Sequence, residues 1–368
     1  MSNKKKTPTD LTDLRSHIDN IDRQMLELLN RRAEISISVG KTKADNNEEL
    51  IFKPFREKEL LEKLANLNIG PLPESHLRAI YTEILSSSRR LQRPERVVYL
   101  GPEGTFSYFA ALENLGHSAE LMPKNNFEEI FRAVHEGEAE LGLIPLENSL
   151  QGTVGQNLDM FRHYPVYIQA EVYYRISHGL LSKEKTIGAI KRVYSHSKAI
   201  DQCGNWLRTN LPYCERIPAA STASAVRRVS EKPEGAAAIG NTKLADMYDM
   251  NILADRLEDA PDNWTRFLVI GRSPAKEGIS DKTSLLFTTP DKPGALADVL
   301  NTLAVNGINM TKLESRPAVG EKWKYVFFAD LECNLAGEGH EEVITQLAKI
   351  CNTFRILGSY PAGKMRIK

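Results

Sequence analysis

The stretch LTDLRSHIDNIDRQMLELLNRRAEISISVGKTKAD, residues 11–45, decides how the chain begins. Its apolar residues recur every three or four positions, the spacing of one face of an amphipathic helix: Leu14, Ile18, Ile21, Met25 and Leu28. No proline and only one glycine, Gly40, lie between Pro8 and Pro54, so one helix of roughly 50 Å can run through the stretch. A compact domain of about 100 residues has a radius of gyration near 13 Å, so such a rod would protrude alone. We therefore expect a second copy of the chain to pack alongside it.

Two further helices are expected before residue 94. The second starts at Pro54, which suits a first helical turn, and the third follows the break GPLP at 70–73. The apolar positions that define them are Leu60, Leu61 and Leu64 in the second and Leu77, Ile80, Ile84 and Leu85 in the third. The first quarter of the chain is therefore predicted to be all helical.

Several polar side chains share faces of these helices. Arg32 and Lys43 are eleven residues apart and return to nearly the same face, with Ser36 and Val39 between them. Arg15 lies about 100° away from Arg32, so it would reach the same site only from a partner chain. Taken singly, such residues are most often solvated surface charges.

The other two helices complete a recognisable pattern. Glu57 follows Arg56 near the start of the second helix, and Ser88 and Gln92 share a face near the end of the third. The segments LRSHIDNIDRQMLELLNRR, VGKTK and PFREKELLEKL resemble the all-helical chorismate mutase domain over residues 11–93. The chain departs from that pattern at Lys53, where some relatives have an aspartate.

That resemblance implies how chorismate would be bound. Arg15 of the other subunit and Arg32 would hold its two carboxylates, and Lys43 and Gln92 would donate to its ether oxygen. The remaining substrate contacts would come from three polar residues: Arg56, Glu57 and Ser88. The rearrangement is pericyclic and needs no nucleophile, metal, cofactor or proton transfer. The site has only to hold a dianion in its compact conformer and stabilise charge on the ether oxygen.

After Pro94 short apolar strands alternate with helical stretches. The first strand is RVVYL at 96–100, and the others are LGLIP at 141–145, RVYS at 192–195, CERIP at 214–218 and AAAIG at 236–240. Strands that alternate with helices predict an α/β domain with a largely parallel sheet.

Three turns rich in glycine or hydroxyl residues follow strands where helices should begin. They are GPEGTFS at 101–107, SHSKAIDQC at 195–203 and ASTASA at 220–225. Helix N-termini that face one cleft would bind a small anion, although a single hydroxyl at such a place more often caps its own helix. None of the three has the glycine pattern of a nucleotide loop.

Two more motifs, IPLENSLQGTV at 144–154 and NWTRFLVIG at 263–271, make the pattern specific. Together with the three turns they resemble prephenate dehydratase over residues 97–272. The resemblance implies two lobes like those of periplasmic binding proteins, with the active site between them and Thr265 as the catalytic residue. Its hydroxyl could assist departure of the C4 hydroxyl as prephenate loses CO₂ and becomes aromatic. Further candidate ligands are Thr105, Asn148, Ser149, Gln202, Ser221 and Arg266. In a strand Arg266 could equally point outward, and Glu147 could be either an acid or a paired surface carboxylate.

From Lys282 the predicted order is βαββαβ, the ferredoxin-like arrangement, with a strand expected over 322–333. PDKPGALADVL at 290–300 and ESRP at 314–317 resemble the ACT domain, which senses amino acids. The resemblance implies that phenylalanine binds where two such domains pair. The alternative is that this unit serves only to dock against another surface and binds no effector. The candidate effector-binding residues are Gly294, Ala295, Leu296, Glu314 and Ser315.

Composition excludes several other classes of protein. Lysine plus arginine equals aspartate plus glutamate at 48 each, so we expect no nucleic-acid partner. No CxxC or HExxH motif occurs, so we expect neither a disulfide framework nor a metal site. No apolar run could span a membrane, and the polar start MSNKKKTPTD is no secretory signal, so we expect a cytoplasmic protein.

The order of the three resemblances matches the bifunctional chorismate mutase/prephenate dehydratase family, with domains at 1–94, 95–273 and 282–361. The expected partners are chorismate, prephenate, the effector L-phenylalanine and further copies of the chain, as a homodimer or higher homo-oligomer. Two alternatives remain open. One is a dehydratase that prefers arogenate. The other is a ligand-sensing regulator, although residues 1–93 carry 17 basic and 14 acidic side chains, a net charge of only +3 for contacting DNA.

Overall fold

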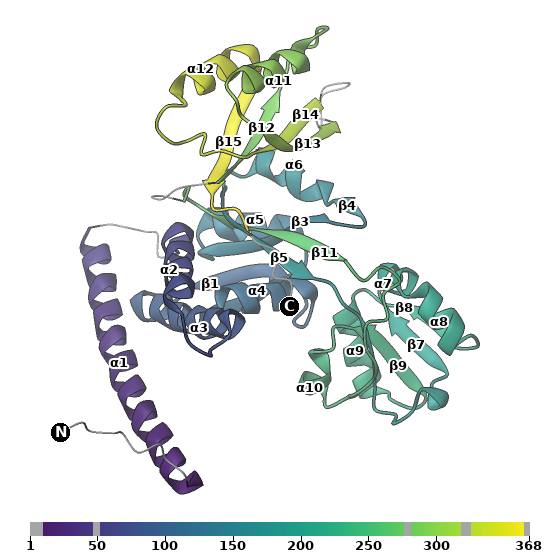
Figure 1. The fold of residues 1–368 in the computed structure, drawn as a ribbon. Helices are drawn as coiled ribbons and strands as arrows, with labels where there is room; N and C mark the ends of the chain where they lie inside the picture. The colour runs from purple at the N-terminus through teal and green to yellow at the C-terminus, as the bar shows by residue number, and fades with distance from the viewer. Residues whose placement is uncertain (1–9, 47–51, 276–280, 318–324, 364–368) are drawn as a thin grey trace, which may run out of the picture.

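The computed structural model describes residues 10–46, 52–275, 281–317 and 325–363. Three parts follow one another along the chain: a helical part, a two-lobed α/β part and a C-terminal α/β unit (Figure 1). The polar start and residues 322–324 of the expected strand 322–333 lie outside the described residues.

The helical part consists of α1 (Leu11–Asp45), α2 (Pro54–Leu67) and α3 (Glu74–Gln92), as predicted. The C-terminal half of α1 packs on α3, whereas its N-terminal half extends away from the rest of the chain (Figure 1). The apolar stripe that predicts this helix is 43–65% exposed: Leu14, Ile18, Ile21, Met25 and Leu28. A helix with a long exposed apolar face needs another surface to cover it.

The first lobe of the α/β part is built on a sheet with the order β2-β1-β3-β11-β5. Its strands are β1 (Arg96–Leu100), β2 (Glu120–Lys124), β3 (Leu141–Asn148), β5 (Tyr167–Arg175) and β11 (Trp264–Gly271), with β4 (Gly152–Thr153) paired to β3. Its helices are α4 (Phe106–Leu115), α5 (Phe127–Glu136) and α6 (Gly155–His163).

The second lobe has a sheet with the order β10-β6-β9-β7-β8. Its strands are β6 (Gly179–Ser182), β7 (Arg192–Ser195), β8 (Glu215–Pro218), β9 (Ala236–Gly240) and β10 (Asn251–Ala254). Its helices are α7 (Ser197–Gln202), α8 (Gly204–Asn210), α9 (Thr222–Glu231) and α10 (Leu244–Tyr248), with a single 3₁₀ turn at Ile187–Ala189. The chain passes between the lobes twice, after β5 and before β11.

The expectation of one largely parallel sheet is wrong. Each lobe has its own sheet, and both sheets are mixed. In the first, β1 pairs in parallel with β2 and β3, but β11 lies antiparallel between β3 and β5. In the second, β7 pairs in parallel with β8 and β9, but β6 lies antiparallel between β9 and β10. The reversed strands, β6 and β11, are the first strands after each crossing between the lobes.

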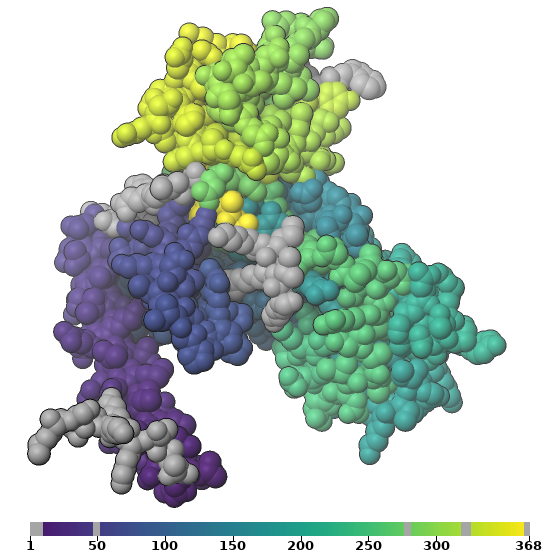
Figure 2. Space-filling model, viewed as in Figure 1, coloured from purple at the N-terminus to yellow at the C-terminus, as the bar shows by residue number. Residues whose placement is uncertain are grey.

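The C-terminal unit has the predicted βαββαβ order and an antiparallel sheet, β13-β14-β12-β15. Its elements are β12 (Lys282–Thr288), α11 (Ala295–Val305), β13 (Met310–Pro317), β14 (Tyr325–Leu331), α12 (Glu341–Ile350) and β15 (Thr353–Tyr360). The two helices cover one face of the sheet, and the other face rests on the first lobe (Figures 1 and 2). Leu286, Phe328 and Tyr360 there share one buried core with Ile168 and Leu268 of the first lobe. The C-terminal unit therefore packs directly on the first lobe through a shared core.

Among the residues that the structure describes, no helix is long and apolar enough to cross a membrane, and no cluster of three potential metal ligands occurs. All four cysteines are free thiols. Burial raises the pKa of Cys333 and Cys351 to about 11, so both are protonated at neutral pH.

Candidate active sites

The interface between α1 and α3 brings together four of the residues predicted for the mutase site. Arg32 donates through Nη1 to the hydroxyl of Ser88, and Lys43 donates to Oε1 of Gln92 at 3.1 Å. Gln92 in turn donates to the carbonyl of Ser88 at 3.2 Å. Two cationic groups and an amide therefore lie close together between α1 and α3, a charge arrangement that suits an anion.

Gly40 explains how the two helices come close enough for these contacts. A Cβ atom at Gly40 would lie 2.8 Å from the Cα of Gln92, closer than van der Waals contact allows. Alanine would favour the helix by about 1 kcal/mol, so propensity does not account for glycine here. The absence of a side chain lets α1 approach α3 beside Lys43 and Gln92.

Glu57 is held by an arginine that the sequence did not single out. Arg89 is buried and pairs with Glu57 at 2.6 Å and Glu95 at 2.9 Å, and it also donates to the carbonyl of Leu115 in the first lobe. Arg89 therefore fixes Glu57 and connects the helical part to the α/β part. In the sequence, only its position directly after Ser88 indicated that Arg89 lies near the mutase site.

Two other predicted residues lie apart from this group. Arg15 is exposed on the protruding half of α1, and Arg56 is exposed in the first turn of α2. That Arg15 serves the site of a partner chain stays a prediction.

In the α/β part, the register of β11 divides its side chains between two faces. Thr265 lies directly opposite Asn148 on β3 and Tyr174 on β5, and opposed residues of antiparallel strands share a face. Tyr174 packs against Phe106 of the GPEGTFS turn. Thr265 therefore faces the turn that lies against the second lobe, where Gly104 approaches Leu244 and Ala223.

Asn148 organises the polar groups around Thr265. Its Nδ2 donates to Thr265 Oγ1 at 2.9 Å and to Asn263 Oδ1 at 2.7 Å, while its Oδ1 accepts from the backbone N–H groups of Leu150 and Gln151. Those two backbone donors fix the orientation of the amide. Thr265, only 8% exposed, consequently accepts from Asn148 and keeps its own proton for another acceptor.

Asn263 is a member of this cluster that the sequence analysis missed, although it opens the NWTRF motif. Its Oδ1 must face Asn148, so its Nδ2 is left buried without a hydrogen-bond partner. A buried unpaired N–H donor is rare and costly, and it marks a place where a ligand or water is expected.

Three predicted hydroxyl ligands have structural roles. Ser149 accepts from the N–H of Trp264 at 2.9 Å and ties β3 to β11. Thr105 caps α4, and Ser221 caps α9 in a reciprocal pair with Ser224. Thr105 and Ser149 also donate their protons, to the carbonyls of Leu100 at 3.0 Å and Asp262 at 3.3 Å, so neither hydroxyl is a free donor. Ser221 accepts from the N–H of Ser224, and among the described residues its own proton is left for another acceptor.

Gln202 lies at the boundary between the lobes beside a histidine. Its Oε1 is 3.0 Å from Nε2 of His178, a buried residue in the first connection between the lobes. Phe106 packs edge-to-face on the His178 ring, with 5.5 Å between ring centroids. Burial lowers the pKa of His178, which is therefore neutral at neutral pH.

Arg266 requires a correction, because it does not face the Thr265 cluster. Its guanidinium is buried on the opposite side of β11, where it pairs with Glu171 at 2.6 Å and with Asp330 of the C-terminal unit, and donates to the hydroxyl of Tyr360 at 3.1 Å. Burial acts to lower the pKa of Arg266, but Tyr360, Asp330 and Glu171 together raise it, so it stays charged. The side chain joins two domains and is not available to a substrate carboxylate.

Comparisons with known proteins agree with this division of the chain. Residues 14–93 match the family described as chorismate mutase type II, residues 97–275 match prephenate dehydratase, and residues 283–351 match the ACT domain. A bifunctional chorismate mutase/prephenate dehydratase of Aquifex aeolicus (strain VF5) is 40% identical over 97% of this chain and 99% of its own length. The chain belongs to the bifunctional chorismate mutase/prephenate dehydratase family.

Solved structures are similar to this chain over about three quarters of its length. The prephenate dehydratase of Arthrobacter aurescens, in complex with L-Phe, is 30% identical with a TM-score of 0.67, over 72% of this chain and 90% of that one. A structure described as GqqA, a quorum-quenching acylase, is 29% identical with a TM-score of 0.68, over 74% of this chain and all of that one.

In the ACT domain, the residues predicted to bind an effector do not lie on one face. Gly294 has φ +84 at the start of α11, in open space. Glu314 accepts from Thr153 of the dehydratase domain at 2.9 Å, so it faces away from α11 and α12, whereas Ser315 is exposed. An effector site that uses both Gly294 and Glu314 would therefore need two paired domains, and it stays a prediction.

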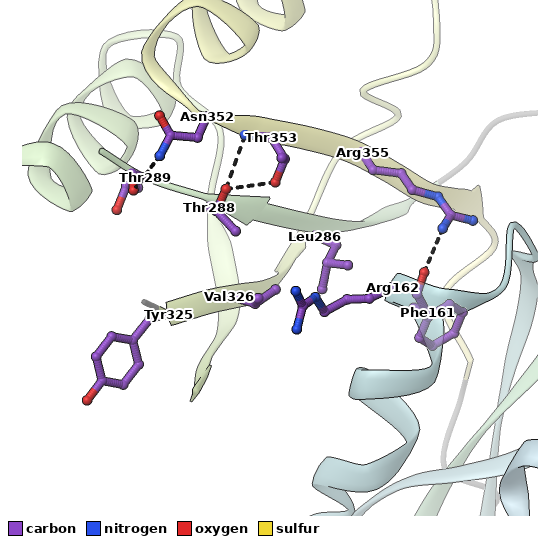
Figure 3. A pocket seen from close by; sticks show the side chains of 10 residues that line it. All are labelled: Phe161, Arg162, Leu286, Thr288, Thr289, Tyr325, Val326, Asn352, Thr353 and Arg355. Atoms are coloured by element: carbon purple, nitrogen blue, oxygen red, sulfur yellow. Dashed lines mark hydrogen bonds between the residues drawn. The ribbon is translucent and has the colours of Figure 1, made fainter. Parts of the chain in front are cut away.

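A cavity of about 330 Å³ lies where α6 meets the ACT sheet (Figure 3). Arg162 extends into it between Leu286 and Val326, and Arg355 closes one end by donating to the carbonyl of Phe161 at 2.6 Å. The cavity shares no residue with the Thr265 cluster.

Proposed function

We propose that the chain converts chorismate to prephenate in its helical domain and prephenate to phenylpyruvate, CO₂ and water between the lobes of its second domain, under inhibition by L-phenylalanine. The family membership and the two separate polar clusters support this sequence of reactions. The product of the first site, prephenate, is the substrate of the second.

In the mutase site, Arg32 would hold one carboxylate of chorismate, and Arg15 of a second copy would hold the other. Lys43 and Gln92 would donate to the ether oxygen, where negative charge builds as the C–O bond breaks. Ser88 accepts from Arg32 and helps to orient it, and Glu57, which is fixed by Arg89, would contact the remaining polar groups of the substrate. The exposed apolar stripe of α1 supports a homodimer in which the two rods pack together.

In the dehydratase site, Thr265 would donate a hydrogen bond to the C4 hydroxyl of prephenate. As that C–O bond breaks, the bond from the ring to the departing carboxylate supplies the electron pair that makes the ring aromatic. The hydroxide takes up one proton from solvent and leaves as water, CO₂ leaves separately, and Thr265 keeps its own proton. Asn148 sets the direction of the Thr265 hydroxyl, and Gln202 would donate to another oxygen of the substrate.

Regulation is proposed at the ACT domain. The N-terminus of α11 offers free N–H groups to the carboxylate of phenylalanine, and Gly294 leaves room for its approach. An acceptor for the ammonium would come from a second ACT domain or from backbone carbonyls. We place the protein in the cytoplasm, where its cysteines stay reduced.

The observation that carries the proposal is the Asn148–Thr265 contact in a chain that also holds Lys43 against Gln92. The test is to supply chorismate alone, without cofactor, and to follow phenylpyruvate. Formation of prephenate that is not consumed would contradict the second activity. Comparing kcat/KM for prephenate and arogenate decides between the two dehydratase substrates.

A further inference from the structure

His178 lies in the first connection between the lobes, and its backbone is fixed on both sides. Its N–H donates to Glu258 Oε2 at 2.9 Å, and its carbonyl accepts from the N–H of Leu257 at 2.9 Å. Glu258 also accepts from the hydroxyl of Ser177, so one carboxylate joins the two connections between the lobes. The His178 ring has little freedom to move.

The protonation of the ring follows from its surroundings. An amide oxygen only accepts, so the contact between His178 Nε2 and Gln202 Oε1 at 3.0 Å requires a proton on Nε2. Burial keeps the ring neutral, and Nδ1 therefore carries a lone pair, buried and without a partner. The reversed amide would leave an unpaired N–H at Nδ1, which is the costlier arrangement.

The contact also fixes Gln202. It uses Oε1, and among the described residues the Gln202 side chain makes no other hydrogen bond, so the Nε2 amide group is left to donate elsewhere. The backbone of Gln202 is held as well, because its carbonyl accepts from the N–H of Asp259 at 2.7 Å. Without His178, the amide could rotate and present oxygen in place of nitrogen.

We propose that His178 is a positioning residue of the dehydratase site, whose Nε2–H holds Gln202 so that the Gln202 amide nitrogen faces an oxygen of the substrate. The inference rests on the proposed role of Gln202. His178 donates no proton to the substrate and acts only through the glutamine.

The experiment is a double-mutant cycle in the full chain with prephenate as substrate. His178→Phe keeps the ring that packs on Phe106 but removes the donor, and Gln202→Met keeps the length of the side chain but removes the amide. We expect Gln202→Met to lower dehydratase kcat/KM about 10–100-fold, the range for losing one hydrogen bond to a charged group. His178→Phe should lower it about 5–30-fold alone and add nothing in the double variant, because coupled residues are not additive.

Controls separate the possible failures. Mutase activity of each variant, measured on the same chain, reports folding. His178→Gln, which places an N–H near the position of Nε2, should recover part of the activity. Full additivity in the cycle, or no recovery by His178→Gln, would overturn the inference. A silent Gln202→Met would instead overturn the proposed role of Gln202.

A second measurement is made on the wild-type protein and uses one variant only for assignment. In protein labelled with ¹⁵N-histidine, the His178 signals, assigned by their loss in His178→Gln, should show the Nε2–H tautomer and no titration near pH 6.5. An Nδ1–H tautomer would contradict the proposal.

Discussion

Asn148 donates a hydrogen bond to the hydroxyl oxygen of Thr265 across the β3–β11 pair, at 2.9 Å. The direction of this bond cannot be reversed, because the backbone N–H groups of Leu150 and Gln151 hold the amide oxygen on the other side. The orientation of one amide thus leaves the Thr265 hydroxyl proton for the donor role that we propose. Two predictions follow from this geometry, one for each partner.

Asn148→Asp should lower dehydratase kcat by about 10²–10³, the range for losing one preorganised donor. The carboxylate still accepts from the two backbone N–H groups and has nearly the same shape, so the turn should survive. It would, however, accept the Thr265 proton and withdraw it from the substrate. Steady-state rates with prephenate test this, with mutase rate and melting temperature as controls. Unchanged kcat would show that the direction of the bond is unimportant.

Thr265→Ala should lower dehydratase kcat by about 10²–10⁴, the range for loss of a positioned proton donor. Thr265→Ser keeps the hydroxyl and should retain more activity than alanine. Both variants should rearrange chorismate at the wild-type rate, because the mutase residues lie on α1 and α3. If alanine dehydrates prephenate as fast as threonine, Thr265 is structural.

The sequence was sufficient for elements whose pattern is local. RVVYL at 96–100, RVYS at 192–195 and the helix at 11–45 have the bounds that their apolar spacing predicts. Strand direction was mispredicted, because it depends on which strands become neighbours. The face of Arg266 was equally hidden: all eight residues of β11 are buried, so no alternation of polar and apolar residues indicates which side each one faces. His178 has no motif at all, and only its contact with Gln202 reveals it.

Gly40→Ala should lower mutase kcat/KM by about 10–100-fold, since a misplacement approaching 1 Å at a site can cost 10²-fold. The new Cβ would overlap the backbone at Gln92 and push α1 away from α3. Gly70→Ala is the matched control, because its Cβ would meet only Asn68 Oδ1 at 3.8 Å. Assays with chorismate check both. Equal effects of the two substitutions, or none, would contradict a packing role for Gly40.

The mutase site is predicted to draw Arg32 from one chain and Arg15 from the other. Arg15→Ala and Arg32→Ala should each be nearly inactive as mutases. Mixed dimers of the two variants have one intact site, so unfolding and refolding them together at equal amounts should recover roughly a quarter of wild-type activity. Each variant refolded alone is the control. Absence of recovery, with mixed dimers demonstrated, would place both arginines in the same chain's site.

Effector binding can reach the dehydratase site through β13. Lys312 pairs with Glu147 at 3.0 Å and donates to the Thr153 hydroxyl at 2.8 Å, and that hydroxyl donates to Glu314. Glu147 immediately precedes Asn148, which orients Thr265. A movement of the ACT sheet would therefore be transmitted to the end of β3 that carries the catalytic cluster.

Thr153→Val keeps the shape of this contact and removes both of its hydrogen bonds. We expect the phenylalanine concentration for half-inhibition to rise about 5–150-fold, since coupling between sites is typically 1–3 kcal/mol. Basal dehydratase activity should change little, because Thr153 does not touch the Thr265 cluster. Thr345→Val, on the exposed side of α12, is the matched control.

Calorimetry should show that phenylalanine still binds to the Thr153 variant. Because coupling is reciprocal, a substrate analogue that weakens phenylalanine binding to the wild type should weaken it less in this variant. Full inhibition of the Thr153 variant at the wild-type concentration would mean that the signal takes another route, and the Arg266–Asp330 pair is the contact to test next.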